Sequence, residues 1–351
     1  MQRISGTLAE NGYDILLVGR KRKRSIPLSS AQFSQKRLSC FFEKGILFYV
    51  EFSIRLFLFL GQQKADAFCA IDLDTILPVL LMSKIRKKIR VYDAHEFFTE
   101  QKEIITRPMI HKIWDWIENQ TVPHFKNGYT VNEFLRDSFL LKYGTDYAVI
   151  RNLPFLQETE KESIEGFPEQ FILYQGAVNE GRCFETLVPA MKDVPVPLVI
   201  IGEGNFFQQT KRLIQKYDLQ EKIILKGYIA PNLLQKITQH AIFGLTLFEA
   251  TGLNQYHSLA NRFFDYIMAA IPQVCVNFPE YARINEEYEV ALMTNNTTPQ
   301  ALSDAMNKLL NDTVLYNRMV YHCRLARREL NWNIEQQKLL VFWKNIFTLS
   351  A

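Results

Sequence analysis

The amino-acid sequence predicts an α/β protein with two doubly wound domains in tandem. Short apolar runs of strand length alternate with helix-length amphipathic segments along nearly the whole chain, which is typical of mainly parallel sheets covered by helices. A polar segment at residues 157–169 interrupts this pattern, which then restarts. The 351 residues suffice for two domains of ordinary size, each with its own core.

The expected elements follow in order along the chain. In the first half, strands are predicted at residues 13–18, 67–71, 89–92, 129–131 and 148–150, and helices at 46–60, 74–87, 107–122 and 132–143, with Asp74 at the helix start. In the second half, strands are predicted at 171–174, 197–201, 222–225, 243–247 and 273–276, and helices at 183–193, 205–217, 231–239, 258–269, 298–310 and 313–347.

Composition and charge narrow the class of protein. The net charge is only +4, and the five cysteines are far apart without a CxxC pair, which fits a reducing compartment rather than a disulfide framework. No signal peptide is visible at the start. The basic run at residues 20–24 is interpreted as a solvated loop, or as a contact with an anionic membrane or a phosphorylated acceptor. The apolar stretch 46–60, which carries Glu51 and Arg55, is a buried helix or an interfacial one.

One candidate catalytic motif follows the predicted strand 89–92. Asp93, His95 and Glu96 lie where this strand ends, and ligands of doubly wound sheets bind at the carboxyl ends of strands. A histidine there can hydrogen-bond a sugar hydroxyl, with the acids orienting it or an acceptor. The alternative is a histidine with a structural role.

Two glycine-containing turns in the second half are candidate ligand loops. Gly176 follows the strand 171–174, and Arg182 lies near the start of the next helix, where it can pair with a phosphate. Gly202 and Glu203 follow the strand 197–201 in the same way. Each turn alone is also compatible with ordinary strand–turn–helix packing.

The longest motif leads from the strand 243–247 into a helix expected to begin near Ser258. Its N-terminus would offer unpaired N–H groups to a pyrophosphate. Asp265 follows two turns later, and a carboxylate can accept both hydrogen bonds of a ribose diol. The alternative is a capped helix with a solvated acid. The residues assigned to nucleotide binding here are Glu249, Asn254, His257, Ser258, Asn261, Arg262 and Asp265.

Several common catalytic signatures do not occur in the sequence. HExxH, CxxC, GxSxG, GxGxxG and the Walker A loop are all missing. Asp72 and Asp74 form an acid-x-acid pair of the kind that metal-dependent sugar transferases use, but here the pair is interpreted as a strand end and a helix cap. We therefore expect no catalytic metal.

At this point the chain resembles the retaining GT-B glycosyltransferases of family 4, in particular a bacterial subgroup common in Bacteroidetes. The matching segments cover nearly the whole chain in the expected order: LAENGYDILLVGR, AIDLDTILP, VYDAHEFFTE, YTVNE, VIRNLP, LYQGAVNEGR, IIGEG and SLANRFFDYIMAAIPQVCVNFPEY. The resemblance implies two Rossmann-like domains facing across a cleft. Residues 1–155 would bind the acceptor, residues 156–330 the donor, and the helix in 331–351 would pack back towards the first domain.

The resemblance also implies an activity. A UDP- or GDP-linked sugar would be transferred to a hydroxyl of a glycan or lipid-linked saccharide, with retention at the anomeric carbon and without a metal or cofactor. By position, His95 is similar to the histidine that contacts the donor sugar, Arg182 to the basic residue at the diphosphate, and Asp265 to the second acid of E-x7-E, which binds ribose. The protein would be cytoplasmic, with peripheral contact to an anionic membrane and no nucleic-acid partner.

Three departures from the family pattern stand out. His257 replaces the first Glu of E-x7-E, for which Glu249 would compensate, and Ala270 replaces a Gly, which we expect to affect packing only. The first strand of the family is missing, because Met1 falls inside the expected first helix. We therefore expect this chain to be less stable or less active than one extended upstream.

Two alternative functions stay open. One is a sugar-nucleotide epimerase of the same fold, which would convert a nucleotide-sugar without an acceptor. The other is a non-catalytic scaffold that binds a nucleotide-sugar or a membrane, which would bind a donor without turning it over.

Overall fold

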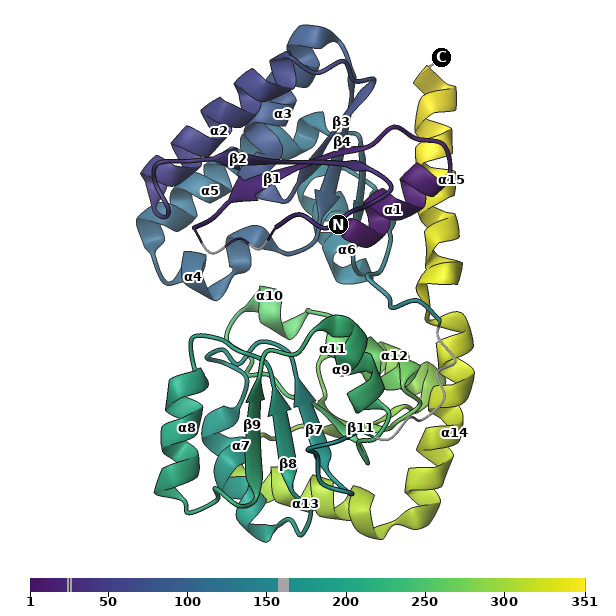
Figure 1. Ribbon diagram of the computed structural model, residues 1–351. Helices are drawn as coiled ribbons and strands as arrows, with labels where there is room; N and C mark the ends of the chain where they lie inside the picture. Colours follow the sequence, from purple (N-terminus) through teal and green to yellow (C-terminus); the bar gives the residue numbers. More distant parts are fainter. Residues whose placement is uncertain (24, 26, 157–163, 351) are drawn as a thin grey trace. The chain divides into compact units, whose positions relative to one another are not determined.

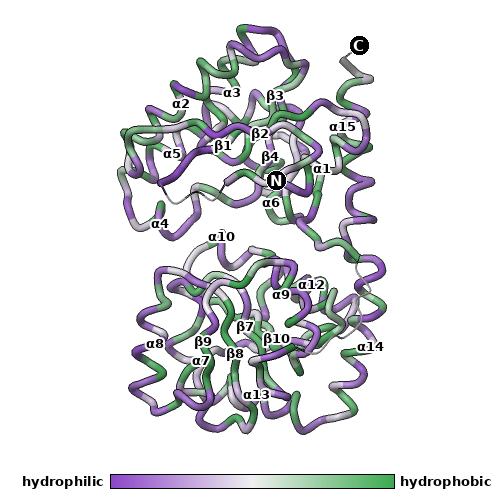
Figure 2. Tube along the Cα trace, in the orientation of Figure 1, coloured by the Kyte–Doolittle hydropathy of each residue, from purple (hydrophilic) through white to green (hydrophobic). Residues whose placement is uncertain are grey.

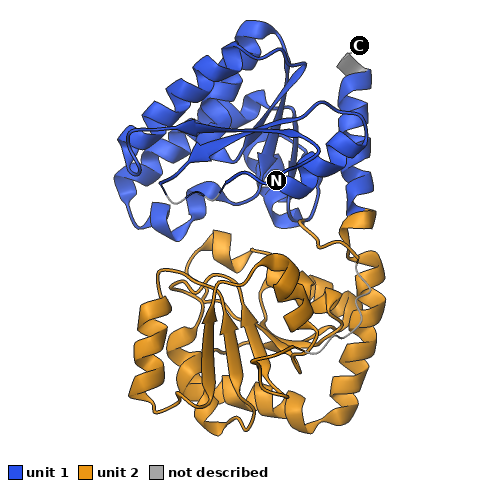
Figure 3. Ribbon diagram, in the orientation of Figure 1, with its two compact units in different colours: residues 1–151, 335–351 blue, residues 152–334 orange. Residues whose placement is uncertain are grey.

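The structure is a computed structural model that describes residues 1–23, 25, 27–156 and 164–350. It divides into two compact units (Figure 3): unit 1 comprises residues 1–151 and 335–351, and unit 2 comprises residues 152–334. Arg24 of the basic run and residues 157–163 of the expected linker lie outside the described residues. The sequence predicts a domain boundary between residues 155 and 156, and the two units divide between residues 151 and 152. The sequence also predicts that the helix in 331–351 packs towards the first domain, and residues 335–351 belong to unit 1.

Unit 1 contains two parallel sheets. β3 (Ala67–Ile71), β4 (Ile89–Ala94), β5 (Asn127–Thr130) and β6 (Ala148–Val149) pair in that order, while β1 (Leu16–Lys21) pairs with β2 (Ser34–Ser39). The strand–helix alternation predicts one sheet, whereas the described strands form two, and β2 was not predicted. Its sequence SQKRLS lacks the apolar run of a buried strand, and its residues are indeed half exposed.

The helices of unit 1 surround these strands (Figure 1). They are α1 (Gln2–Glu10), α2 (Ile46–Gly61), α3 (Leu73–Arg86), α4 (Lys102–Ile105), α5 (Pro108–Thr121), α6 (Glu133–Tyr143) and α15 (Trp332–Ser350), with 3-10 turns at Phe98–Glu100 and Val122–His124. The core gathers around Tyr92, whose ring contacts Phe125, Phe139 and Tyr147.

The end of the chain contributes to unit 1 through α15. Phe342 meets the ring of Tyr129 on β5 edge-on, with centroids 5.2 Å apart, and Phe347 lies 5.8 Å from the ring of Tyr13. Near the helix start, Glu335 accepts a hydrogen bond of 2.7 Å from the backbone N–H of Arg151. The expected helical stretch 313–347 is thus divided, because α14 (Thr313–Glu329) ends before Asn331 and α15 begins after it.

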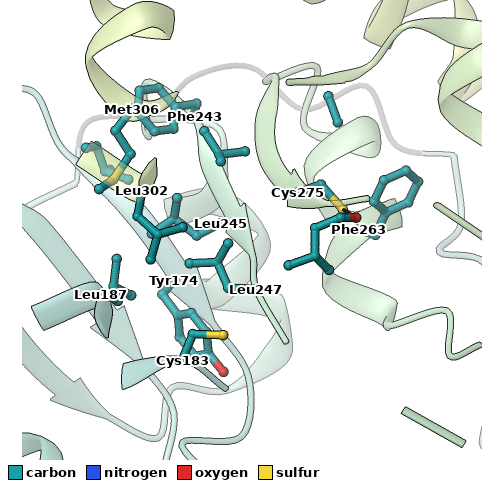
Figure 4. Packing of buried hydrophobic residues seen from close by; sticks show 14 of the residues in the cluster. Tyr174, Cys183, Leu187, Phe243, Leu245, Leu247, Phe263, Cys275, Leu302 and Met306 are labelled. Carbon is teal, nitrogen blue, oxygen red and sulfur yellow. Dashed lines mark hydrogen bonds between the residues drawn. The ribbon is translucent and has the colours of Figure 1, made fainter. Parts of the chain in front are cut away.

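Unit 2 has one parallel sheet in the order β12-β11-β10-β7-β8-β9. The strands are β7 (Ile172–Gln175), β8 (Leu198–Ile201), β9 (Ile223–Gly227), β10 (Gly244–Thr246), β11 (Gln273–Val276) and β12 (Ala291–Thr294). All four residues of β8 and all four residues of β11 are buried, without the alternation of a one-sided strand, as expected for a sheet covered on both faces. Figure 4 shows part of this core, where Met306 lies near Phe243 and Leu302, and Phe263 lies near Cys275.

The helices of unit 2 begin and end close to the predicted positions. They are α7 (Phe184–Ala190), α8 (Phe207–Lys216), α9 (Pro231–Thr238), α10 (Leu253–Tyr256), α11 (Asn261–Met268), α12 (Pro279–Tyr288), α13 (Pro299–Asn311) and α14, with a 3-10 turn at Met191–Asp193. Of these, α10 and α12 were not predicted, nor was β12. Within the described ranges, none of the helices combines the length and apolar content needed to cross a bilayer.

Three local expectations are corrected by the structure. The helix expected from Ser258 begins at Asn261, with Ala260 as its N-cap. Asp74 lies inside α3, because that helix begins at Leu73 and Asp72 is its N-cap. Ala270 has φ 56°, a left-handed conformation, so the replacement of a Gly there affects the backbone and not packing alone.

Candidate functional site

The carboxyl end of β7 lies at the point where the strand order of unit 2 reverses. β8 and β9 extend the sheet on one side of β7, and β10, β11 and β12 extend it on the other. In doubly wound sheets, the loops that leave two such strands from their carboxyl ends diverge, and ligands bind between them. The loop 176–182 follows β7, and the loop 247–252 follows β10.

The loop after β7 is held by the loop after β8 through close backbone contact. A Cβ at Gly202 would lie 1.8 Å from the carbonyl oxygen of Gly176, and a Cβ at Gly204 would lie 2.3 Å from that of Val178. The N–H of Val178 donates to the carbonyl of Glu203 at 3.0 Å. Gly176 and Gly202, predicted as ligand-binding, thus have a packing role, as does Gly204, and the side chain of Glu203 is exposed.

Two arginines converge on one aromatic ring beside this loop. The guanidinium of Arg182 lies 4.2 Å from the ring centre of Phe248, and that of Arg262 lies 4.9 Å from the same ring. Arg262 is 7% exposed and also covers the ring of Tyr174 at 4.4 Å. Arg182 Nε and Arg262 Nη1 are buried without a hydrogen-bond partner. In the described part of the chain, neither guanidinium forms an ion pair with a carboxylate.

The two charges act on each other because the site is desolvated. Burial, and after it the charge of Arg262, lowers the pKa of Arg182. Arg182 is half-buried and Arg262 is buried, and two like charges placed so close together are costly without a counter-ion, so the arrangement favours a bound anion with several oxygens. Arg182 was predicted for this role, and Arg262 was assigned to the same site.

Asp265 is oriented by a buried polar relay that sequence reasoning missed. Gln175, at the end of β7, donates from Nε2 to Asp265 Oδ2 at 3.0 Å and accepts from the Thr238 hydroxyl at 2.7 Å. Gln175 and Thr238 are 3% and 2% exposed. The only sequence signal was a polar residue at the end of an otherwise apolar strand. The relay fixes the direction of the Asp265 carboxylate, which suits a hydroxyl-bearing ligand.

The segment between β10 and α11 is a short helix and turn rather than an open loop. Gln255 on α10 donates from Nε2 to the carbonyl of Gly181 at 2.7 Å, which ties this segment to the β7 loop. Ser258 donates to the carbonyl of Gln255 at 2.9 Å, so it belongs to this turn and is not a helix cap. Burial lowers the pKa of His257, whose ring stands edge-on to Tyr256.

The other predicted residues of this motif are spread along the same segment. The backbone N–H of Glu249 donates to Gly181 at 3.1 Å, and its side chain is half-buried, while Asn254 lies on α10. Asn261 is exposed at the start of α11 and accepts from Asn152 at 3.0 Å. α11 itself is fixed to the sheet by Tyr266, whose hydroxyl donates to the carbonyl of Leu173 at 3.1 Å.

In unit 1, a second polar cluster forms where β3 and β4 end. His95 Nε2 lies 3.1 Å from Oδ1 of Asp93, which is 1% exposed, and the backbone N–H of His95 donates to Asp72 at 2.9 Å. Asp72 has φ 53°, a conformation that non-glycine residues rarely adopt. The side chain of Met1 also reaches this cluster, with its sulfur 3.0 Å from His95 Nε2.

The pKa values of this cluster are set by burial and by its acids. Burial alone would lower the pKa of His95, but the carboxylates of Asp93 and Asp72 outweigh it and raise that pKa. Burial raises the pKa of Asp72, although His95 opposes the shift. The cluster thus holds a proton near neutral pH, and a histidine held in this way can donate a hydrogen bond.

Of the three predicted catalytic residues, the structure brings two together. Asp93 and His95 are in contact, but Glu96 is exposed and accepts a hydrogen bond from Gln101 instead. Asp72, which was interpreted only as a strand end, is the residue that takes its place. In the described part of the chain, no three His, Cys, Asp or Glu side chains gather as metal ligands would.

The sequence of this second half matches a known family. Residues 157–325 match the family model described as Glycosyl transferases group 1. The matched segment contains the arginine pair, the Gln175 relay and α11. No curated protein sequence is similar enough to the chain to count as a relative.

Solved structures resemble the whole chain, not the segment 157–325 alone. Sucrose-phosphate synthase from Thermosynechococcus elongatus is similar with a TM-score of 0.80 at 14% identity, over 99% of this chain and 92% of that one. WaaG, a glycosyltransferase involved in lipopolysaccharide biosynthesis, gives 0.71 at 14% identity, over 97% and 93%. Anabaena HepE in complex with UDP and glucose gives 0.68 at 12% identity, over 91% and 87%.

These likenesses confirm the predicted fold class. The chain has two Rossmann-like units of the kind found in GT-B glycosyltransferases. Together with the family match over residues 157–325, they support a GT-B glycosyltransferase. The roles of individual residues stay predictions.

Proposed function

We propose that this protein is a retaining glycosyltransferase of family 4 type that moves a hexosyl group from a nucleotide diphosphate sugar to an acceptor hydroxyl. The acceptor would be a glycan or a lipid-linked saccharide, and transfer would need neither a metal nor a cofactor. The observation that carries the proposal is the pair Arg182 and Arg262 on the ring of Phe248, the first half-buried and the second buried, with no carboxylate partner among the described residues.

The pair can supply the positive charge that a diphosphate leaving group needs. When the bond between the anomeric carbon and the diphosphate breaks, negative charge grows on the diphosphate, while the acceptor oxygen bonds to the same carbon and its proton passes to the departing diphosphate. Two preorganised guanidinium groups in a desolvated site stabilise that charge more in the transition state than in the ground state. They act in place of the metal ion that other transferases use.

Other residues of both units are given roles in this proposal. Asp265, held by Gln175, would accept the hydroxyl hydrogen bonds of the ribose, and His257 and Asn254 would lie along the nucleotide. His95, held by Asp93 and Asp72, would donate a hydrogen bond to the donor sugar. The donor would be UDP- or GDP-linked; HepE is described in complex with UDP and with UDP-glucose.

A thermal-shift assay with UDP, GDP and their sugars tests the proposal, because a ligand that binds the native state raises its melting temperature. The unaltered protein should be stabilised by one nucleotide, and Arg182→Ala should lose most of that shift and at least about a hundredfold in transfer rate. Arg318→Ala is the control, since Arg318 is a half-exposed arginine of the same unit, paired with Glu289.

The result also separates this proposal from its alternatives. A normal turnover in Arg182→Ala would refute the role of that residue. Formation of an epimerised nucleotide-sugar without an acceptor would identify an epimerase instead. Binding without hydrolysis or transfer across a panel of acceptors would identify a non-catalytic protein.

We further propose that the protein is cytoplasmic and contacts an anionic membrane peripherally. The five free cysteines are consistent with a reducing compartment. A lipid-linked acceptor would be reached at the membrane surface. Fractionation of cells into soluble and membrane pools, with and without high salt, would locate the protein.

A further inference from the structure

Three adjacent helices of unit 1 each expose an apolar stripe. The stripe on α2 continues from an exposed loop, and the spacing of about four residues places each stripe along one face of its helix. α2 packs on α3, and α3 packs on α5, so the stripes are neighbours (Figure 1). The residues are Phe41, Phe42, Ile46, Leu47, Val50, Ile54 and Leu58, then Leu77, Leu81 and Ile85, then Met109, Ile113 and Trp116. We call these thirteen residues the apolar face.

The α2 helix is unusual because it is apolar on opposite sides. Phe48, Phe52 and Leu56 are buried in the core, while Val50, Ile54 and Leu58 are 50–58% exposed. Its two charged residues, Glu51 and Arg55, pair with each other at 2.7 Å. Figure 2 shows hydrophobic colour along much of this helix. A helix that is hydrophobic all round normally lies in a protein core or in contact with lipid, and a contiguous exposed patch of this kind marks an interaction surface.

Beside the apolar face, a hollow continues the apolar surface. It has a volume of about 280 Å³ and lies between β2 and α2, lined by Leu38, Ser39, Arg55, Leu58, Phe59 and Gln62. Most of the lining surface is apolar, and Arg55 contributes a charged side chain to it. A hollow of this composition suits a short apolar chain near a polar head better than a folded protein surface.

Basic residues lie at both ends of the apolar face. Lys44, Arg22 and Lys23 lie before the start of α2, and Lys84, Arg86 and Lys87 lie at the end of α3, where Arg86 donates to the carbonyl of Gly61 at the end of α2. Residues 1–151 and 335–351 hold 25 Lys and Arg against 17 Asp and Glu, and residues 152–334 hold 16 against 20. Unit 1 therefore carries a formal charge of +8 and unit 2 one of −4.

We infer that the apolar face and its basic ends form a docking surface for an anionic lipid bilayer. The inference rests on the peripheral membrane contact of the proposed function and assigns that contact to named residues. Apolar side chains would enter the boundary between headgroups and acyl chains, and the lysines and arginines would meet the anionic headgroups. A second copy of the chain fits less well, because a two-fold interface would set basic ends against basic ends.

Vesicle binding measures this surface directly. The full-length protein is sedimented with vesicles of phosphatidylcholine, with and without about one third phosphatidylserine. We expect binding that needs phosphatidylserine and falls as salt rises. Both the triple variant Ile54→Ser, Leu58→Ser, Ile85→Ser and the double variant Lys44→Ala, Lys84→Ala should bind about tenfold more weakly or worse.

The matched control is Val314→Ser, Tyr321→Ser, Leu325→Ser, which removes three exposed apolar side chains from α14 of unit 2. It should bind vesicles as the unaltered protein does. Because all substituted residues are exposed, circular dichroism and melting temperature should stay unchanged in every variant.

Three results would overturn the inference. The unaltered protein does not bind the anionic vesicles; the triple variant binds them as well as the control does; or the triple variant converts a dimer into a monomer, which would identify a second copy as the occupant. The UDP-induced thermal shift is measured on the same samples. Vesicle binding without that shift would contradict the proposed function alone, and the shift without vesicle binding would contradict this inference alone.

Discussion

Arg182 and Arg262 illustrate how a binding residue can oppose stability in the free protein. Both guanidinium groups lie on the ring of Phe248, both have a buried nitrogen without a partner, and burial together with the charge of Arg262 lowers the pKa of Arg182. The native state thus contains a cost that a bound anion would relieve. Active sites commonly trade stability for function in this way.

This trade leads to a prediction for Arg182→Met. Methionine keeps an unbranched apolar stem on Phe248 but removes a desolvated charge. The free variant should therefore have a free energy of unfolding about 1 kcal/mol higher, and its melting temperature should rise by a few degrees. The stabilisation by UDP or GDP should disappear in the same variant. Differential scanning calorimetry with and without nucleotide measures both. A lower melting temperature for the free variant would show that the charge is compensated.

A second residue-scale prediction concerns Asp74, which lies inside α3 rather than at its start. Burial raises the pKa of Asp74 to about 6, from a usual value near 4. A raised folded-state pKa means that the folded protein binds the proton more tightly than the unfolded chain does. This contribution to stability is therefore lost as pH rises from about 4 to about 6.

Asp74→Asn should remove that loss. At pH 7 the variant should be more stable by about 1–3 kcal/mol, and the difference should vanish below about pH 4. Urea unfolding at a series of pH values measures the difference. A difference in free energy of unfolding that does not depend on pH would show that the effect comes from the amide itself and not from the charge of Asp74.

The residues of the candidate site were predictable where chemistry and chain position agree. Arg182 and Asp265 carry a charge next to a strand end or on the following helix, so the sequence pointed to them. Gln175 was not recognised because an uncharged amide at the end of an apolar strand has no distinctive pattern, and its role depends on Thr238 and Asp265, far away in the sequence. Glu96 lies apart from the pair Asp93 and His95 because adjacent residues point in different directions after a strand.

At the scale of elements, the core strands were predictable and their surroundings were not. β7, β8 and β11 are buried runs of branched and aromatic side chains, which only a covered parallel strand accommodates. β2 is polar and half exposed, so it leaves no such pattern. The start of α11 was placed three residues early because Ser258 is a preferred cap residue, whereas its hydroxyl is used within the turn after α10.

The end of α11 yields a prediction at this scale. Ala270 follows the helix with φ 56°, where a Cβ is unfavourable, and its N–H donates to the carbonyl of Ile267. Ala270→Gly should stabilise the protein by about 1 kcal/mol, because glycine adopts this helix-end conformation without steric cost. Thermal unfolding measures the change. Ala269→Gly, one residue earlier and in a right-handed conformation, is the control and should be destabilising.

At the scale of the whole molecule, the two units should respond differently to a nucleotide. The arginine pair, Gln175 and Asp265 all belong to unit 2, and the His95 cluster belongs to unit 1. UDP or GDP without a sugar should therefore slow amide hydrogen exchange in residues 173–182 and 247–268 and leave residues 67–96 unchanged. Mass spectrometry of the exchanged peptides measures this. Equal protection in both units would contradict the assignment of the nucleotide to unit 2.

The division of the chain between the units also bears on how the protein is made. Unit 2 is one continuous segment, residues 152–334, whereas unit 1 needs residues 335–351 to cover Tyr129 and Tyr13. During translation the second unit leaves the ribosome whole while the first, although synthesised earlier, still lacks its last helix. The first unit therefore waits, with part of its aromatic surface uncovered, until residues 335–351 have been synthesised. Removing that segment would damage the half of the protein that was synthesised first.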